Sequence, residues 1–166
     1  MIYLIGLILF GILAILESTI VSRMQLINGT ADLFLLFIVA WALQDRVESA
    51  WQWCIIGGIF ASLYTALPFG SLVIAYLIAT GIARVMKHRI WKAPYLAMLV
   101  ATFIGTLIVQ LVSLSARLVM GINIPITSTL NIIFLPGLLL NLILAIPIYS
   151  IMHDVAGWLY PEELEA

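Results

Sequence analysis

Long apolar runs alternate with short polar links along the chain, a pattern that is typical of membrane-spanning helices. A helix that crosses the hydrocarbon core of a bilayer needs about 20 predominantly apolar residues. The pattern predicts one all-α integral membrane domain over residues 1–166, a six-transmembrane-helix bundle with spans at residues 2–21, 31–44, 51–66, 69–86, 94–119 and 131–152. The second run is short, so it either borrows length from its flanks or thins the bilayer locally.

The segment 57–84 has the most regular spacing of small residues, which recur at every fourth position on both sides of a turn. Residues four apart share one helix face, and small residues let helices approach closely in lipid. We therefore expect a tight helical hairpin at the centre of the bundle, whose small face serves either general packing or partner binding. The candidate positions are Gly57, Gly58, Ala61, Ser62, Pro68, Gly70, Ala75, Ala79 and Ala83.

The fifth run carries a polar stripe. Its members are spaced 4, 4, 3 and 4 residues apart and therefore share one helix face. Such a face is expected to point into the bundle or into a water-filled cavity, where it forms interhelical hydrogen bonds or binds a ligand. The stripe consists of Thr102, Thr106, Gln110, Ser113 and Arg117.

Three further polar residues interrupt apolar runs. Glu17 ends the first run, either as a surface carboxylate or with a buried partner. Asp32 is expected to cap the second helix. Asn141 lies between Pro136 and Pro147, which are expected to kink the sixth helix and to free backbone carbonyls for the Asn141 side chain.

Aromatic and basic residues predict where the helices leave the membrane. Trp51 and Trp53 are expected to lie at a membrane–water boundary. Basic residues favour the cytoplasmic side, and five lie on one side of the predicted bundle against two on the other. The five are Arg46, Arg84, Lys87, Arg89 and Lys92, and the two are Arg23 and Arg117. Both termini are therefore predicted to be cytoplasmic, and the turn at Pro68 faces outward.

Composition agrees with residence in lipid and excludes several classes of function. The chain is 64% hydrophobic and 9% charged, whereas soluble domains are roughly 45–50% apolar and about 25% charged. A net charge of -1 without a basic patch argues against nucleic-acid binding. The single Cys54 excludes an intramolecular disulfide. The two histidines, His88 and His153, are far apart, and no catalytic motif is present. We therefore expect neither an enzyme nor a bound metal or cofactor.

Several segments resemble motifs of the MreD family, the six-span membrane proteins of the bacterial cell-elongation (rod shape) machinery. The matching residues are Glu17-Ser18-Thr19, Ala31-Asp32-Leu33-Phe34-Leu35-Leu36, Leu67-Pro68-Phe69-Gly70, Ala75-Tyr76-Leu77, Gly81-Ile82-Ala83-Arg84 and Asn141 before Pro147. Two positions depart from the family: Ala31 replaces a usual Pro, and Ser62 stands where Asp is frequent. Either a function of that Asp is missing here, or Ser replaces a packing residue.

The resemblance implies a non-enzymatic protein of the bacterial cytoplasmic (inner) membrane that helps regulate cell shape and peptidoglycan synthesis. Its implied partner is MreC, a bitopic protein with a periplasmic coiled coil. Through MreC it would be linked to the glycosyltransferase RodA, a class B penicillin-binding transpeptidase and MreB filaments. The implied fold is similar to that of the substrate-binding components of energy-coupling-factor vitamin transporters.

Two functions follow as hypotheses. A scaffold would hold partner membrane helices in a groove beside the hairpin. A substrate-binding transport component would need a cavity with converging polar groups. The candidate residues for these groups are Thr102, Thr106, Gln110 and Asn141. We favour the scaffold, because the outer links are short and offer few groups that could close over a ligand.

Overall fold

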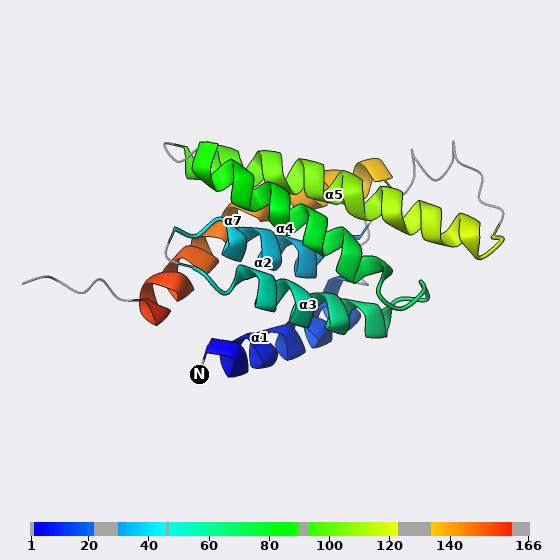
Figure 1. Cartoon of the computed structure of the whole chain (residues 1–166), viewed down its shortest axis with the longest axis horizontal. Helices are drawn as coiled ribbons and strands as arrows, with labels where there is room; N and C mark the ends of the chain where they lie inside the picture. Colours follow the sequence, from blue (N-terminus) through cyan, green and yellow to red (C-terminus); the bar gives the residue numbers. More distant parts are fainter. Residues whose placement is uncertain (1, 22–29, 46, 90–92, 123–133, 161–166) are drawn as a thin grey trace, which may run out of the picture.

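The chain folds into a helical bundle in the computed structural model, which describes residues 2–21, 30–45, 47–89, 93–122 and 134–160 (Figure 1). These residues form α1 (Ile2–Leu16), the π-helical turn η1 (Glu17–Val21), α2 (Leu33–Ala42), α3 (Ala50–Tyr64), α4 (Ser71–Arg89), α5 (Pro94–Val119) and α7 (Leu135–Leu159), without a strand among them. The all-α class predicted from the sequence is confirmed. Arg23, Arg46, Lys92 and residues 131–133 of the predicted sixth span lie outside the described residues.

The centre of the bundle is the short helix α2, around which α3, α4, α5 and α7 pack (Figure 1). Eight of its ten residues are buried, which fits a helix that is apolar on every side. The prediction that the hairpin 57–84 forms the centre is therefore wrong. The fourfold spacing of small residues indicates a helix face that packs closely, but it does not indicate which helix lies at the centre. The central helix α2 is apolar on every side, so its sequence shows no alternation of polar and apolar positions.

Three helices are long and apolar enough to cross a membrane, namely α4, α5 and α7. The helices α1, α2 and α3 are apolar but shorter. The ten residues of α2 rise only about 15 Å, half of a hydrocarbon core of about 30 Å. Because α2 is enclosed by the other helices, its short length exposes little of its backbone.

The predicted hairpin exists as α3 and α4, joined by a turn in which Gly70 adopts φ +92°. The hydroxyl and the backbone N–H of Ser71 both donate to the carbonyl oxygen of Pro68. At Gly58 an added Cβ would lie 3.0 Å from the Cα of Val73, so the absence of a side chain permits this contact between α3 and α4. The small positions Ala75, Ala79 and Ala83 are fully buried within the chain.

Trp53 is buried inside the bundle and cannot face lipid headgroups as a boundary aromatic would, which corrects the prediction for it. Its side chain is 0% exposed and stacks on Trp41 with ring centroids 4.1 Å apart. An added Cβ at Gly6 of α1 would lie 3.0 Å from the Trp53 ring. Trp53 therefore fills the space between α1 and α2, whereas Trp51, two residues earlier, points outward.

The last helix ends later than predicted, at Leu159 and not at residue 152. Pro136 lies in the first turn of α7, where its missing N–H removes no hydrogen bond of α7. A kink between α7 and residues 131–133 would lie outside the described residues. Pro147 does lie inside the helix. His153 lies within α7, six residues before its end, and its Nδ1 is 3.1 Å from the Oε1 of Gln44 in the loop after α2.

Cations at the end of α4 bind carbonyl groups that follow α2. Lys87 donates to the carbonyl oxygens of Gln44 and Asp45 at 2.7 and 3.0 Å. Arg84 donates to the carbonyl oxygen of Glu48 at 3.0 Å. These carbonyl groups lie in the loop between α2 and α3, and hydrogen bonds from charged donors are stronger than those from neutral donors. These contacts fix α4 against α2 at the end of the bundle opposite to the Pro68 turn.

Candidate functional site: a polar cavity at the Pro68 end

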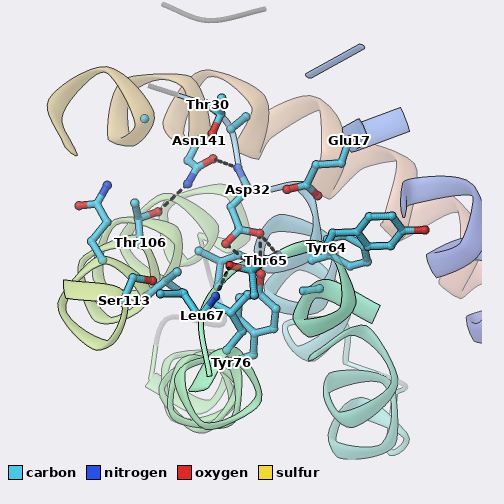
Figure 2. Close-up of a pocket in the computed structure, with 18 of the residues that line it drawn as sticks. Glu17, Thr30, Asp32, Tyr64, Thr65, Leu67, Tyr76, Thr106, Ser113 and Asn141 are labelled. Carbon is cyan, nitrogen blue, oxygen red and sulfur yellow. Dashed lines mark hydrogen bonds between the residues drawn. The ribbon is translucent and has the colours of Figure 1, made fainter. Parts of the chain in front are cut away.

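A cavity of about 460 Å³ opens at the end of the bundle that carries the Pro68 turn (Figure 2). It lies where η1, α3 and α5 approach their C-terminal ends and where α2, α4 and α7 begin. Its volume falls in the range of small-molecule sites. Its polar lining residues are Glu17, Ser18, Thr30, Asp32, Tyr64, Thr65, Tyr76, Thr106, Gln110, Ser113, Arg117 and Asn141.

Asp32 is the hub of a hydrogen-bond cluster on the cavity wall. Its Oδ1 accepts from the backbone N–H of Leu35 at 2.9 Å, so the predicted helix cap is confirmed. The hydroxyl of Tyr76, on α4, donates to both Asp32 oxygens at 2.8 and 3.0 Å. The carboxylate thus joins the first turn of α2 to a buried position on α4.

Asn141 on α7 joins the same cluster from the other side. Its Oδ1 accepts from the backbone N–H of Asp32 at 2.8 Å, and its Nδ2 donates to the Oγ1 of Thr106 at 3.0 Å (Figure 2). Backbone carbonyls at a proline kink are therefore not its partners, contrary to the prediction. An added Cβ at Gly137 would lie 3.2 Å from the carbonyl oxygen of Thr30, which shows how closely α7 approaches the start of α2.

Four of the five residues of the polar stripe on α5 line the cavity, as the shared helix face predicts. Thr106 binds Asn141, and the Nε2 of Gln110 donates to the carbonyl oxygen of Phe134 at 3.2 Å. Ser113 and Arg117 follow toward the exposed end of α5. Thr102 is the exception, because it is fully buried among the helices and does not reach the cavity.

Two acceptor atoms of the lining residues are buried without a donor among the described residues. They are the Oε2 of Glu17 and the Oε1 of Gln110. Glu17 begins the π-helical turn η1, and its carboxylate points toward Asp32 (Figure 2). Of the two alternatives for Glu17, its partial burial beside the cavity excludes a surface carboxylate. A buried acceptor without a donor costs roughly 1–3 kcal/mol, more for a charged group.

The packing positions of the hairpin contribute little to this site. Only Ala61 among them lines the cavity. Gly57, Gly58, Ala75, Ala79 and Ala83 pack against neighbouring helices, the buried hydroxyl of Ser62 donates to the carbonyl oxygen of Gly58 at 2.7 Å, and Pro68 and Gly70 form the turn. The small face therefore serves packing within the chain.

Residue patterns alone did not indicate that Glu17, Asp32 and Tyr76 belong together. The sequence indicates separate roles for Glu17 and Asp32, at the end of a span and as a helix cap. Tyr76 occurs only within a motif of the MreD resemblance. That resemblance is the available signal, because its motifs contain all three residues without placing them near one another.

The chemistry that the lining offers is binding through carboxylate, amide, hydroxyl and guanidinium groups. Among the described residues, no group of three or more His, Cys, Asp or Glu side chains could hold a metal ion. Comparison of the chain with models of protein families, with curated proteins and with solved structures gave no match. The site is therefore interpreted from its own geometry.

Proposed function

We propose that the chain is an MreD-like, non-enzymatic membrane scaffold that binds an MreC-like bitopic protein and helps to regulate peptidoglycan synthesis and cell shape. The supporting observation is that five of the six MreD-like motifs, far apart in sequence, supply residues to one cavity, the exception being Gly81-Ile82-Ala83-Arg84. Glu17, Asp32, Leu67, Tyr76 and Asn141 each come from a different helix or link and all line it. Apolar motifs that matched by chance would have no reason to converge in this way.

The proposed location is the bacterial cytoplasmic (inner) membrane, with all six helices as spans and both termini cytoplasmic. The excess of basic residues at the end opposite to the Pro68 turn favours that end as the cytoplasmic one. The cavity would then open outward, on the side where an MreC-like partner carries its coiled coil. RodA, a class B penicillin-binding transpeptidase and MreB would join through that partner.

The surface proposed for the partner helix is the outer face of the hairpin. The small face cannot serve, because Ala75 and Ala79 are already covered by neighbouring helices. Ile74 and Ile78 of α4 are 57% and 46% exposed and lie four residues apart on one face. Ile59 of α3 is also exposed. A single transmembrane helix could pack along these aliphatic side chains.

Substituting this face tests the scaffold proposal. In Ile74→Trp/Ile78→Trp, we expect recovery of a co-expressed MreC-like protein on the tagged chain to fall about tenfold, which corresponds to roughly 1.4 kcal/mol of binding. Tryptophan keeps the face apolar, so insertion into the membrane is preserved. The matched control is Ile8→Trp on α1, also strongly exposed, which should leave recovery unchanged.

Two outcomes would contradict this proposal. If the unsubstituted chain does not retain an MreC-like protein, the proposed scaffold function is wrong. If recovery is equal with the α4 double variant and with the α1 control, the proposed contact surface on α4 is wrong.

The size of the cavity favours a second candidate, the substrate-binding component of a vitamin-type energy-coupling-factor transporter. A volume of about 460 Å³ would accommodate a vitamin-sized molecule. Under this function, one vitamin at saturating concentration should raise the midpoint of thermal unfolding of the detergent-solubilised chain, since binding to the native state stabilises it. A flat response across a vitamin panel would exclude the candidate.

A further inference from the structure

Two acidic side chains line the cavity, and neither forms an ion pair with a cation among the described residues. Glu17 and Asp32 both line it, and the carboxylate of Glu17 points toward Asp32 (Figure 2). Asp32 is satisfied by Tyr76 and by the backbone of Leu35, whereas the Oε2 of Glu17 has no donor among the described residues. Charge held away from water is strongly disfavoured without a partner. A primary ammonium group carries three N–H donors and a positive charge, so it would satisfy these side chains.

A guanidinium group also contributes to the lining of the cavity. Arg117 lines it and is exposed, in the last turn of α5. Arginine matches the geometry of phosphate oxygens and binds them with paired hydrogen bonds. The lining therefore contains both signs of charge, with carboxylates from η1 and the start of α2 and a cation from α5. Such a site favours a zwitterion over a simple cation or anion.

Arg117 also lines a second hollow, of about 240 Å³, which shares Thr65 and Leu67 with the first. The remaining lining of this hollow comes from Ala66, Met120 and Ile122, all of them apolar. Arg117 therefore belongs both to the polar cavity and to an apolar hollow. An amine-bearing phospholipid contains the three matching kinds of group, namely an ammonium, a phosphate and an acyl chain.

We propose that this end of the bundle binds a phospholipid of the phosphatidylethanolamine type, with its ammonium beside Glu17 and Asp32, its phosphate at Arg117, and its acyl chain entering the apolar hollow. The inference goes beyond the scaffold function and does not depend on a protein partner. It assigns the cavity to a component of the surrounding membrane. A ligand drawn from the bilayer needs no soluble segment to close over it.

Binding to the purified full-length chain in detergent micelles tests the proposal. We would add lipids of identical acyl chains and compare the bound fraction by native mass spectrometry together with the midpoint of thermal unfolding. Phosphatidylethanolamine should bind at least about tenfold more tightly than phosphatidylcholine or phosphatidylglycerol, a difference of roughly 1.4 kcal/mol. The choline headgroup carries a positive charge without an N–H donor, and the glycerol headgroup carries no positive charge.

Two variants locate the site. Glu17→Gln should abolish the preference for phosphatidylethanolamine over phosphatidylcholine, because it removes the charge while preserving size. The matched control is Glu48→Gln, the same change at an exposed position at the opposite end of the bundle, which should leave the preference intact. Arg117→Gln, at an exposed position that should tolerate the change, should weaken binding of both phosphatidylethanolamine and phosphatidylglycerol, because both contain the phosphate.

Soluble phosphoethanolamine distinguishes the two sources of the headgroup. Stabilisation by the lipid alone assigns the site to a membrane lipid and shows that the apolar hollow contributes. Equal stabilisation by soluble phosphoethanolamine retains the headgroup chemistry but assigns the ligand to solution. Equal binding of the three lipids, or an unchanged preference in Glu17→Gln, would overturn the proposal. These measurements contain no partner protein, so their failure would leave the scaffold proposal untouched.

Discussion

Replacing Trp41 with alanine is expected to lower the free energy of unfolding by about 3–5 kcal/mol, the usual cost of removing a large aromatic side chain from a core. Trp41 lies on the central helix α2 and is 0% exposed. Its ring stacks on Trp53, and its Nε1 donates to the Oγ of Ser49 at 3.4 Å. In lipid, helices are stabilised chiefly by close packing, and alanine would leave a void that surrounding helices fill only in part.

The measurement is a titration of the detergent-solubilised chain with SDS, followed by far-ultraviolet circular dichroism. Trp158→Ala is the matched control, because Trp158 on α7 is 77% exposed. Its loss should change stability by no more than about 0.5 kcal/mol, as at most surface positions. Similar losses for both variants would show that α2 is not the packing centre of the bundle.

The features that the sequence predicts correctly depend on contacts between near neighbours. Apolar runs indicate helices, because a helix satisfies its own backbone hydrogen bonds wherever it lies. Asp32 caps α2 through a residue three positions away, so its role follows from local chemistry. The stripe from Thr106 to Arg117 shares one face because helical geometry dictates it, whatever the helix packs against.

The features that the sequence does not predict depend on how helices are arranged around one another. Nothing near Trp53 distinguishes it from Trp51, yet one is buried against α1 and α2 and the other is exposed. The partner of Asn141 is the backbone of Asp32, 109 positions away. The cavity likewise combines six helix ends, so no single segment contains a pattern that would reveal it.

Asp32→Ala is expected to destabilise the chain by about 2–4 kcal/mol, because the carboxylate serves two helices at once. Loss of the cap on Leu35 costs roughly 1 kcal/mol. The hydroxyl of Tyr76, which is 1% exposed, would lose both of its acceptors. A buried hydroxyl left without a partner costs roughly 1–3 kcal/mol. The matched control is Asp45→Ala, at an exposed position beyond the far end of α2, with an expected change within about 0.5 kcal/mol.

A double-mutant cycle separates these two contributions. In a Tyr76→Phe background there is no hydroxyl that could lose its acceptors. Asp32→Ala should then lower the free energy of unfolding only through loss of the helix cap, by roughly 1 kcal/mol. The coupling between the two positions should therefore be about 1–3 kcal/mol, as expected for residues in direct contact. Additive effects would mean that the Tyr76 hydroxyl is satisfied elsewhere. In that case the Asp32 cluster would no longer account for the way in which α4 is held against the start of α2, and the wall of the cavity would owe its shape to packing alone.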